Sequence, residues 1–244
     1  MDLDLRLQRL FDRVELVSGI GTPGLGQMCV MSFAACLAGE GHTDHPSGVS
    51  PVIRSFAILL NDQMPTEIRQ RLKPFAPRVL GTNDGLDSLR AELLRSALVD
   101  RLLPRATEKT APRSIPELAG RLGRFWRGLR GRHVRMQMQK MLQRAEQSCR
   151  PGHELRGTQL AHAAVSLISL RARHADSRDE AEWYWNEAVA LLDRMCDIGG
   201  ARHTLELVRA DRVGWLETVL EQRRRAALSN DGSMASSVAS RPSP

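Results

Sequence analysis

The chain has few aromatic residues and almost no lysine. Phe, Trp and Tyr together make up 4% of its 244 residues, with a single Tyr. Because strands favour aromatic and β-branched side chains, this scarcity argues against an extensive β-sheet. Leu, Ala, Arg, Glu and Gln are abundant instead, and these residues are good helix formers. The composition predicts an all-α fold, an irregular bundle of about eight to ten helices.

The chain also lacks the basic start and apolar core of a secretory signal peptide. Its longest apolar stretch, near 28–38, is too short to span a bilayer. We therefore expect a cytoplasmic protein with no membrane partner. In that compartment the four cysteines are expected to be reduced thiols; they are Cys29, Cys36, Cys149 and Cys196.

Apolar spacing, capping residues and helix breakers divide the chain into expected helices. These cover 2–17, 27–38, 52–60, a short stretch from 66, 84–103, 117–130, 133–149, 158–172, 178–198 and 202–227. Ser50 is a typical N-cap before Pro51, and Gly39 is a natural helix stop. The proline-containing stretch 105–116 is expected to be a linker or loop between an N-terminal part, 1–104, and a C-terminal part, 117–228. One fused domain and two domains both fit this division, and the polar stretch 229–244 is expected to be a disordered tail.

A short loop after Gly39 holds the side chains best suited to chemistry. His42, Asp44 and His45 place two imidazoles and a carboxylate within four residues. Imidazole and carboxylate are ligands for divalent metals and are also general acids and bases. The loop is therefore a candidate metal or catalytic site, which Asp62 or Glu40 could assist. The alternative is structural: Asp44 caps a turn, and the histidines are surface or hydrogen-bonded side chains.

Two further patterns fail as functional motifs. Cys29 and Cys36 cannot share one zinc ion with the loop histidines, because seven helical residues separate them by about 10 Å along the axis. The glycines at 19, 21 and 24 match the spacing of the dinucleotide fingerprint. That fingerprint needs a preceding strand, a following helix and a parallel sheet. We expect helix rather than strand before Gly19, so we interpret the segment as a flexible connection.

The third feature is a cationic segment. Residues 121–150 contain nine basic side chains and one acidic residue, Glu146, so their net charge is 9 − 1 = +8. Guanidinium groups bind carboxylates and phosphates in a bidentate manner, which suggests a protein partner or nucleic acid. A solvated face paired with acidic helices explains the charge equally well. The candidate contact residues are Arg121, Arg124, Arg127, Arg130, Arg132 and Arg135.

The stretch 28–82 resembles a segment of an uncharacterised family of proteins from high-GC bacteria, actinobacteria among them. The shared series is Leu-Ala-Gly-Glu, Asp-His-Pro, Pro-Val-Ile, Leu-Asn-Asp, Arg-Leu-Lys-Pro and Leu-Gly-Thr. Many members carry a cysteine just after Asp-His-Pro, where this chain has Ser47 and Gly48. The resemblance covers about a quarter of the chain, and it implies no particular activity.

Two functions of different classes follow from these features. The first is a non-enzymatic helical interaction or regulatory protein that contacts nucleic acid or an acidic partner through the segment from Arg121 to Arg150. The second is a metal-assisted or acid–base enzyme that uses His42, Asp44 and His45. The absence of a complete catalytic set in the sequence favours the first.

Overall fold

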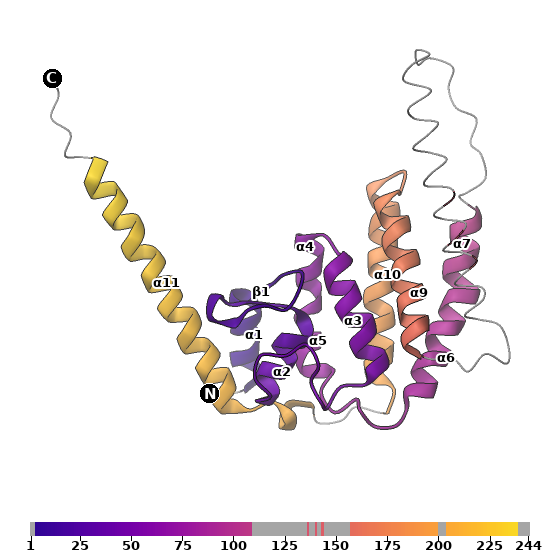
Figure 1. Ribbon diagram of the computed structural model, residues 1–244, viewed down its shortest axis with the longest axis horizontal. Coiled ribbons are helices and arrows are strands. Elements are labelled where there is room, and N and C mark those ends of the chain that lie inside the picture. Colours follow the sequence, from indigo (N-terminus) through magenta and orange to yellow (C-terminus); the bar gives the residue numbers. More distant parts are fainter. Residues whose placement is uncertain are drawn as a thin grey trace, which may run out of the picture.

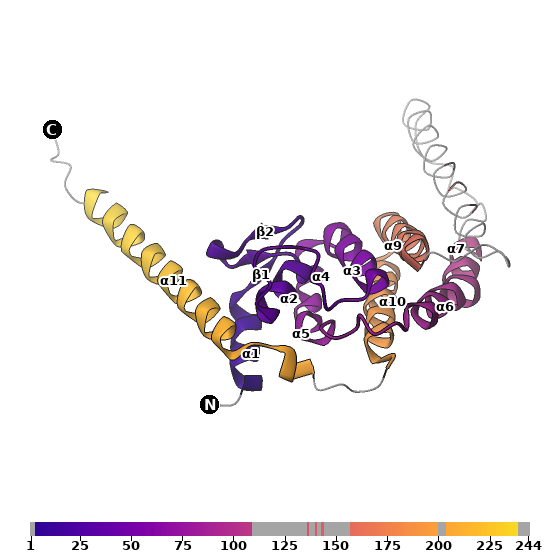
Figure 2. The same cartoon turned by 60° about the horizontal axis from the view of Figure 1, so that its bottom comes forward.

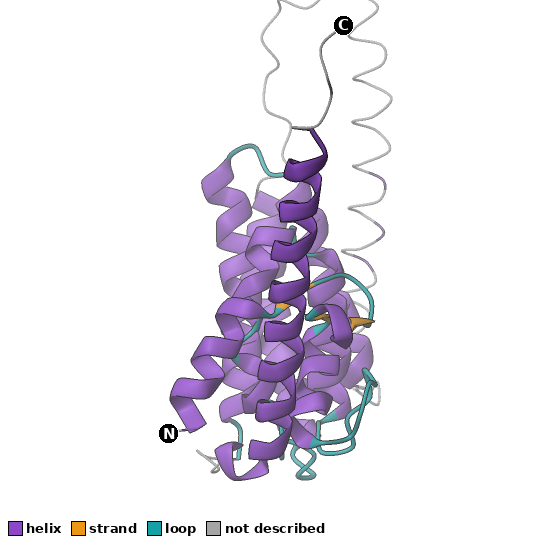
Figure 3. Ribbon diagram, turned by 90° about the vertical axis from the view of Figure 1, so that its left-hand side faces the viewer, coloured by secondary structure: helices purple, strands orange, loops and turns teal. Residues whose placement is uncertain are grey.

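The computed structural model describes residues 3–108, 157–199 and 204–238, together with the isolated residues Met136, Lys140 and Gln143. Figure 3 shows that helices make up nearly all the regular structure in these ranges. The helical elements are α1 (Leu3–Arg13), η1 (Pro23–Leu25), α2 (Val30–Ala38), α3 (Pro51–Gln63), α4 (Thr66–Arg69), η2 (Gln70–Leu72), α5 (Phe75–Arg78), α6 (Asp87–Ala97), η3 (Leu98–Leu102), α7 (Leu103–Glu108), α9 (Gly157–Arg173), α10 (Arg178–Asp197), η4 (Thr204–Leu207) and α11 (Ala210–Val238). The prediction of an all-α bundle is confirmed.

Helix α9 lies among α3, α6 and α10 and packs against all three (Figure 1). Its sequence is apolar nearly all round, which predicts burial on several sides. Leu160, Val165 and Ile168 are accordingly 0–1% exposed. Gly157 begins the helix beside α3, where a Cβ atom would lie 2.4 Å from Cγ2 of Val52. The close approach of α9 to α3 therefore depends on a residue without a side chain.

The predicted helix boundaries around the candidate loop are confirmed. Ser50 accepts hydrogen bonds at its Oγ from the backbone N–H groups of Val52 and Ile53, at 3.2 and 3.3 Å. Pro51 occupies the first helical position after it. Gly39 ends α2 in the left-handed region, with φ at +82°. The loop 39–50 is therefore held between two properly capped helix ends.

The expected helix over 2–17 is wrong in its last residues. Helix α1 ends at Arg13, and β1 (Glu15–Leu16) follows. It pairs in parallel with β3 (Gln27–Met28), which pairs antiparallel with β2 (Gly21–Thr22). Val14 and Leu16 are both buried while Glu15 between them is exposed. Burial of every second residue is the pattern of a strand. The sequence alone also fits a helix here, and only the packing of the folded chain decides between the two.

Two helices run further than their sequences suggest. The helix over 84–103 continues through η3, a π-helical turn, into α7 up to Glu108, and so enters the stretch expected to be a linker. Pro104 is the second residue of α7, just after the π-helical turn, and proline lacks the N–H group that an α-helical turn requires. Helix α11 extends past 227 to Val238. The expected helices over 117–130 and 133–149 lie outside the described ranges, apart from three isolated residues.

None of the helices in the described ranges is both long and apolar enough to cross a membrane.

A buried arginine joins distant parts of the bundle. Arg90 of α6 is fully buried and donates to both carboxylate oxygens of Asp84, at 2.7 and 3.0 Å. Its remaining N–H groups reach the carbonyl oxygens of Met195 and Ile198, at 3.2 and 3.1 Å, at the end of α10. Burial disfavours the charge, but the hydrogen bonds and negative charges of Asp84 and Asp87 outweigh it and raise the pKa of Arg90.

Replacing Arg90 with methionine should lower the free energy of unfolding by about 3–5 kcal/mol. The substitution keeps much of the volume but leaves the Asp84 carboxylate, whose side chain is 2% exposed, without its cation. Urea denaturation followed by circular dichroism measures the change. Arg95→Ala is the control, because Arg95 on the same helix binds Glu92 at the surface and should cost at most about 1 kcal/mol. Equal losses in the two variants would contradict this role for Arg90.

Candidate functional site

The loop 39–50 brings two of its three candidate side chains into contact. Asp44 Oδ1 lies 2.5 Å from His45 Nδ1, and the side chain of His45 is 64% exposed. His42 points elsewhere, with Nε2 at 3.3 Å from the carbonyl oxygen of Ile20. That carbonyl also accepts the N–H of Cys29. The loop thus contains one carboxylate–imidazole pair and one histidine that attaches it to the segment after β1.

The two assisting carboxylates have structural partners of their own. Asp62 accepts the N–H of Gly19 at 2.8 Å and the hydroxyl of Ser18 at 3.2 Å. Glu40 accepts the N–H and the hydroxyl of Ser47, at 2.7 and 3.1 Å, and so closes the loop on itself. Both carboxylates support the loops next to His42, Asp44 and His45.

No cluster of three or more His, Cys, Asp or Glu side chains that could hold a metal ion exists in 3–108, 157–199 or the described side chains of 204–225. Within these ranges, the pair formed by Asp44 and His45 lacks a third ligand. The prediction of a divalent metal at His42, Asp44 and His45 remains untested.

The three cysteines in the described ranges occupy separate positions; Cys29 and Cys36 are buried and Cys196 is half-buried, whereas Cys149 lies outside these ranges. Cys29 is the N-cap of α2, where its Sγ accepts the N–H of Ser32 at 3.2 Å. Cys36 lies in the last part of the same helix and is 6% exposed. Burial raises the pKa of Cys29 and raises the pKa of Cys36 to about 11. Burial also raises the pKa of Cys196, in α10, to about 12. All three are free thiols held in the protonated form.

The glycine-rich segment is not the flexible connection that we expected, because Gly21–Thr22 form β2 and Pro23–Leu25 form η1. A strand does precede it, contrary to the expected helix, but a 3-10 turn and another strand follow rather than an α-helix. At Gly21 φ is +78°, and a Cβ atom there would lie 2.4 Å from the carbonyl oxygen of Gln27. The glycine therefore permits two strands to approach each other.

The six predicted contact arginines lie outside the described ranges: Arg121, Arg124, Arg127, Arg130, Arg132 and Arg135. The structure neither places nor tests them.

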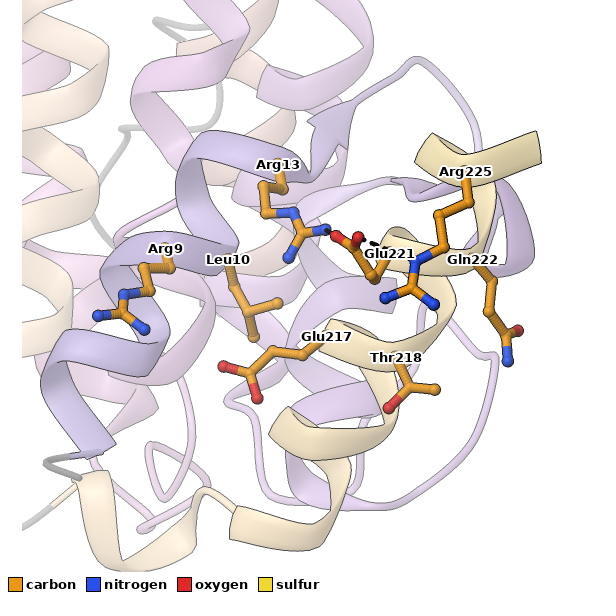
Figure 4. A pocket seen from close by; sticks show the side chains of 8 residues that line it. All are labelled: Arg9, Leu10, Arg13, Glu217, Thr218, Glu221, Gln222 and Arg225. Carbon is orange, nitrogen blue, oxygen red and sulfur yellow. Dashed lines mark hydrogen bonds and ion pairs between the residues drawn. The ribbon is translucent and has the colours of Figure 1, made fainter. Parts of the chain in front are cut away.

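A different arginine site emerges between the first and last helices. A hollow of about 480 Å³ lies between α1 and α11. Figure 4 shows the guanidinium groups of Arg13 and Arg225 on either side of the Glu221 carboxylate. Arg13 Nη2 is 2.9 Å from Glu221 Oε2, and Arg225 Nε is 3.3 Å from Glu221 Oε1. The lining residues are Arg9, Leu10, Arg13, Glu217, Thr218, Glu221, Gln222 and Arg225.

The electrostatics of this groove favour anions at its edge. Hydrogen bonding to Arg225, the charge of Arg224 and the hydrogen bond from Arg13 lower the pKa of Glu221, so its carboxylate stays ionised. Arg223, Arg224 and Arg225 are all exposed on α11, the helix that extends away from the other helices in Figure 2. The guanidinium of Arg223 donates to the carbonyl of Leu25 and so ties α11 to the turn η1.

The chain matches no family model, no curated protein and no solved structure.

The raised thiol pKa values predict unreactive cysteines in the folded protein. A thiol with a pKa of about 11, such as Cys36, is only ~0.1% ionised at pH 8, against ~24% for an unperturbed thiol. In a Cys149→Ser variant, the remaining thiols should react with a disulfide reagent more slowly in the folded protein than in urea, and Cys36 at least about 100-fold more slowly. One thiol that reacts at the unfolded rate at pH 8 would contradict the placement of that cysteine.

Proposed function

We propose that the protein is a non-enzymatic interaction protein that binds the phosphate backbone of nucleic acid through arginines. The observation that carries the proposal is the convergence of Arg13 and Arg225 on Glu221 across the α1–α11 groove. Arg121 to Arg135 would add further contacts. The groove offers a contact that the sequence alone did not indicate.

Geometry supports a polyanion as the ligand. Arg13 and Arg225 face each other from two helices, and their side chains are 33% and 79% exposed. Arg13 contacts Glu221 through Nη2 and Arg225 through Nε, and a guanidinium has five N–H donors. The others can bind the oxygens of a phosphate in a bidentate manner. Arg9 and Arg13 lie four residues apart on one face of α1 and both line the groove, so successive phosphates can contact one surface.

The charge of the whole chain supports the same ligand. Lys and Arg exceed Asp and Glu by 35 − 28 = +7. Such an excess raises the local concentration of polyanions and speeds their association, mainly at low salt. Arginine provides nearly all of this charge, and its planar fork suits phosphate better than the point charge of lysine does.

The double variant Arg13→Ala with Arg225→Ala should bind a fluorescent 20-nucleotide single strand roughly tenfold more weakly at 50 mM NaCl. Loss of two phosphate contacts should also flatten the dependence of log K on log salt by ~1.4. Fluorescence anisotropy at several salt concentrations measures both effects. The control removes two arginines elsewhere, Arg54 of α3 and Arg95 of α6, and so changes the net charge equally.

A second variant of the groove should strengthen binding rather than weaken it. Glu221→Gln should tighten binding several-fold, because the glutamine no longer competes with phosphate for Arg13 and Arg225. Glu92→Gln is the matched control, since it releases Arg95 from a surface ion pair with the same change in net charge. Absence of binding by the unaltered protein would contradict the proposed function. Equal effects of the groove variants and their controls would show that the groove is not the binding site.

The contact between Asp44 and His45 favours one alternative, an acid–base or metal-assisted enzyme. A carboxylate that orients an imidazole is an arrangement used in general base catalysis and in metal binding.

The enzyme alternative predicts that purified protein carries a stoichiometric divalent metal, or turns over a substrate, in a way that Asp44→Ala abolishes. Elemental analysis of both proteins after dialysis measures the first effect. His174→Ala is a control, because His174 is an exposed histidine at the end of α9. Metal content that is the same in the Asp44→Ala protein as in the unaltered one would count against a metal at this loop.

A further inference from the structure

A second hollow, of about 370 Å³, lies where α4 and η2 meet the turn between α9 and α10. This volume is within the range of pockets that hold small molecules. Two stretches of the chain about 100 residues apart build it, 65–71 from α4 and η2 and 172–185 from α9 and α10. The lining residues are Pro65, Glu67, Ile68, Arg71, Ala172, Arg173, Arg178, Ala181, Glu182 and Trp185.

The lining combines apolar surface with cationic groups. Trp185 and Ala172 are 2% and 7% exposed, and they belong to the hydrophobic core. Ile68 and Ala181 are half-buried beside them. Most of the apolar surface that a ligand can touch therefore belongs to Ile68 and Ala181, with a small exposed part of Trp185, and this surface suits a small flat hydrocarbon group.

Three arginines reach the hollow from three different elements, η2, α9 and α10. Arg71 is held by Glu182 Oε2 at 3.0 Å and Asn186 Oδ1 at 2.9 Å. Arg173 is held by Gln63 Oε1 at 2.9 Å and by the carbonyl oxygen of Ser169 at 3.2 Å. These bonds orient two guanidinium groups before any ligand arrives, which lowers the entropy cost of binding.

The third arginine is available for a ligand. Arg178, at the start of α10, is exposed and has no ion pair within the described ranges. The hollow contains three arginines against two carboxylates, and Glu182 is already engaged by Arg71. A ligand with one anionic group therefore meets a net positive charge next to an apolar wall.

We propose that this hollow is a binding site for a small organic anion, with a carboxylate or phosphate near Arg178 and a flat apolar group near Trp185. The site is separate from the α1–α11 groove and does not depend on the proposed contact with nucleic acid.

The test uses phenyl phosphate and benzoate as complete probes, because each combines a flat ring with an anionic group. Inorganic phosphate, which lacks the ring, and benzyl alcohol, which lacks the charge, serve as half-probes. Titration of the ¹⁵N-labelled full chain, followed at the Trp185 indole N–H, measures binding. We expect at least one of the two complete probes to shift this resonance with saturation in the millimolar range or tighter. Each half-probe should bind at least tenfold more weakly than the complete probe. Comparison of phenyl phosphate with benzoate distinguishes phosphate from carboxylate as the preferred anionic group.

Two variants locate the site. Arg178→Ala should weaken the binding of the complete probe about tenfold, whereas Arg54→Ala, in an arginine of α3 that lines neither hollow, should leave it unchanged. Ala181→Phe should fill the hollow and abolish binding, with the other indole resonances showing that the fold is kept. If that variant fails to fold, Arg178→Ala against Arg54→Ala decides alone. The proposal is overturned by the absence of a shift, by equal binding of benzyl alcohol, or by equal losses in the two arginine variants.

Discussion

The buried guanidinium of Arg90 binds parts of the chain that no local pattern connects. It contacts Asp84 just before α6 and two carbonyls at the end of α10, more than 100 residues later. Asp87 continues the network, because the hydroxyl of Ser50, the N-cap of α3, donates to it at 2.5 Å. A charge in this position needs all its partners, since an unpaired buried ion is strongly unfavourable. The ends of α3, α6 and α10 are therefore positioned together.

A second polar cluster holds the candidate loop. Asn61 is fully buried, accepts the N–H of Val30 at 3.3 Å and donates to the carbonyl of Val17 at 2.7 Å. Its neighbour Asp62 accepts the N–H of Gly19. The end of α3 thus fixes the segment from β1 to the start of α2, and His42 attaches to the same segment through Ile20. Of the residues singled out in the sequence, Asp62 has structural partners that explain its presence without chemistry.

The arginine content was visible in the sequence, but its distribution on the folded chain was not. Arg6 and Arg13 lie seven residues apart on α1, and Glu217 and Glu221 lie four apart on α11. Each spacing marks one face of a helix. Nothing local reveals that these two faces meet, because more than 200 residues separate them. The hollow beside Trp185 arises in the same way, from two segments, 65–71 and 172–185, that only packing brings together.

The sequence by itself determined the helical class, most of the helices, the caps at Gly39 and Ser50 and the separation of Cys29 from Cys36. These properties depend on spacing and backbone chemistry within a few residues, which the sequence states directly. Tertiary structure decided that the chain at Leu16 is a strand, that the π-helical turn carries the helix past Pro104, and that the candidate arginine sites lie between distant helices. Each of these outcomes depends on which surfaces meet and exclude water, and that is a property of the whole chain.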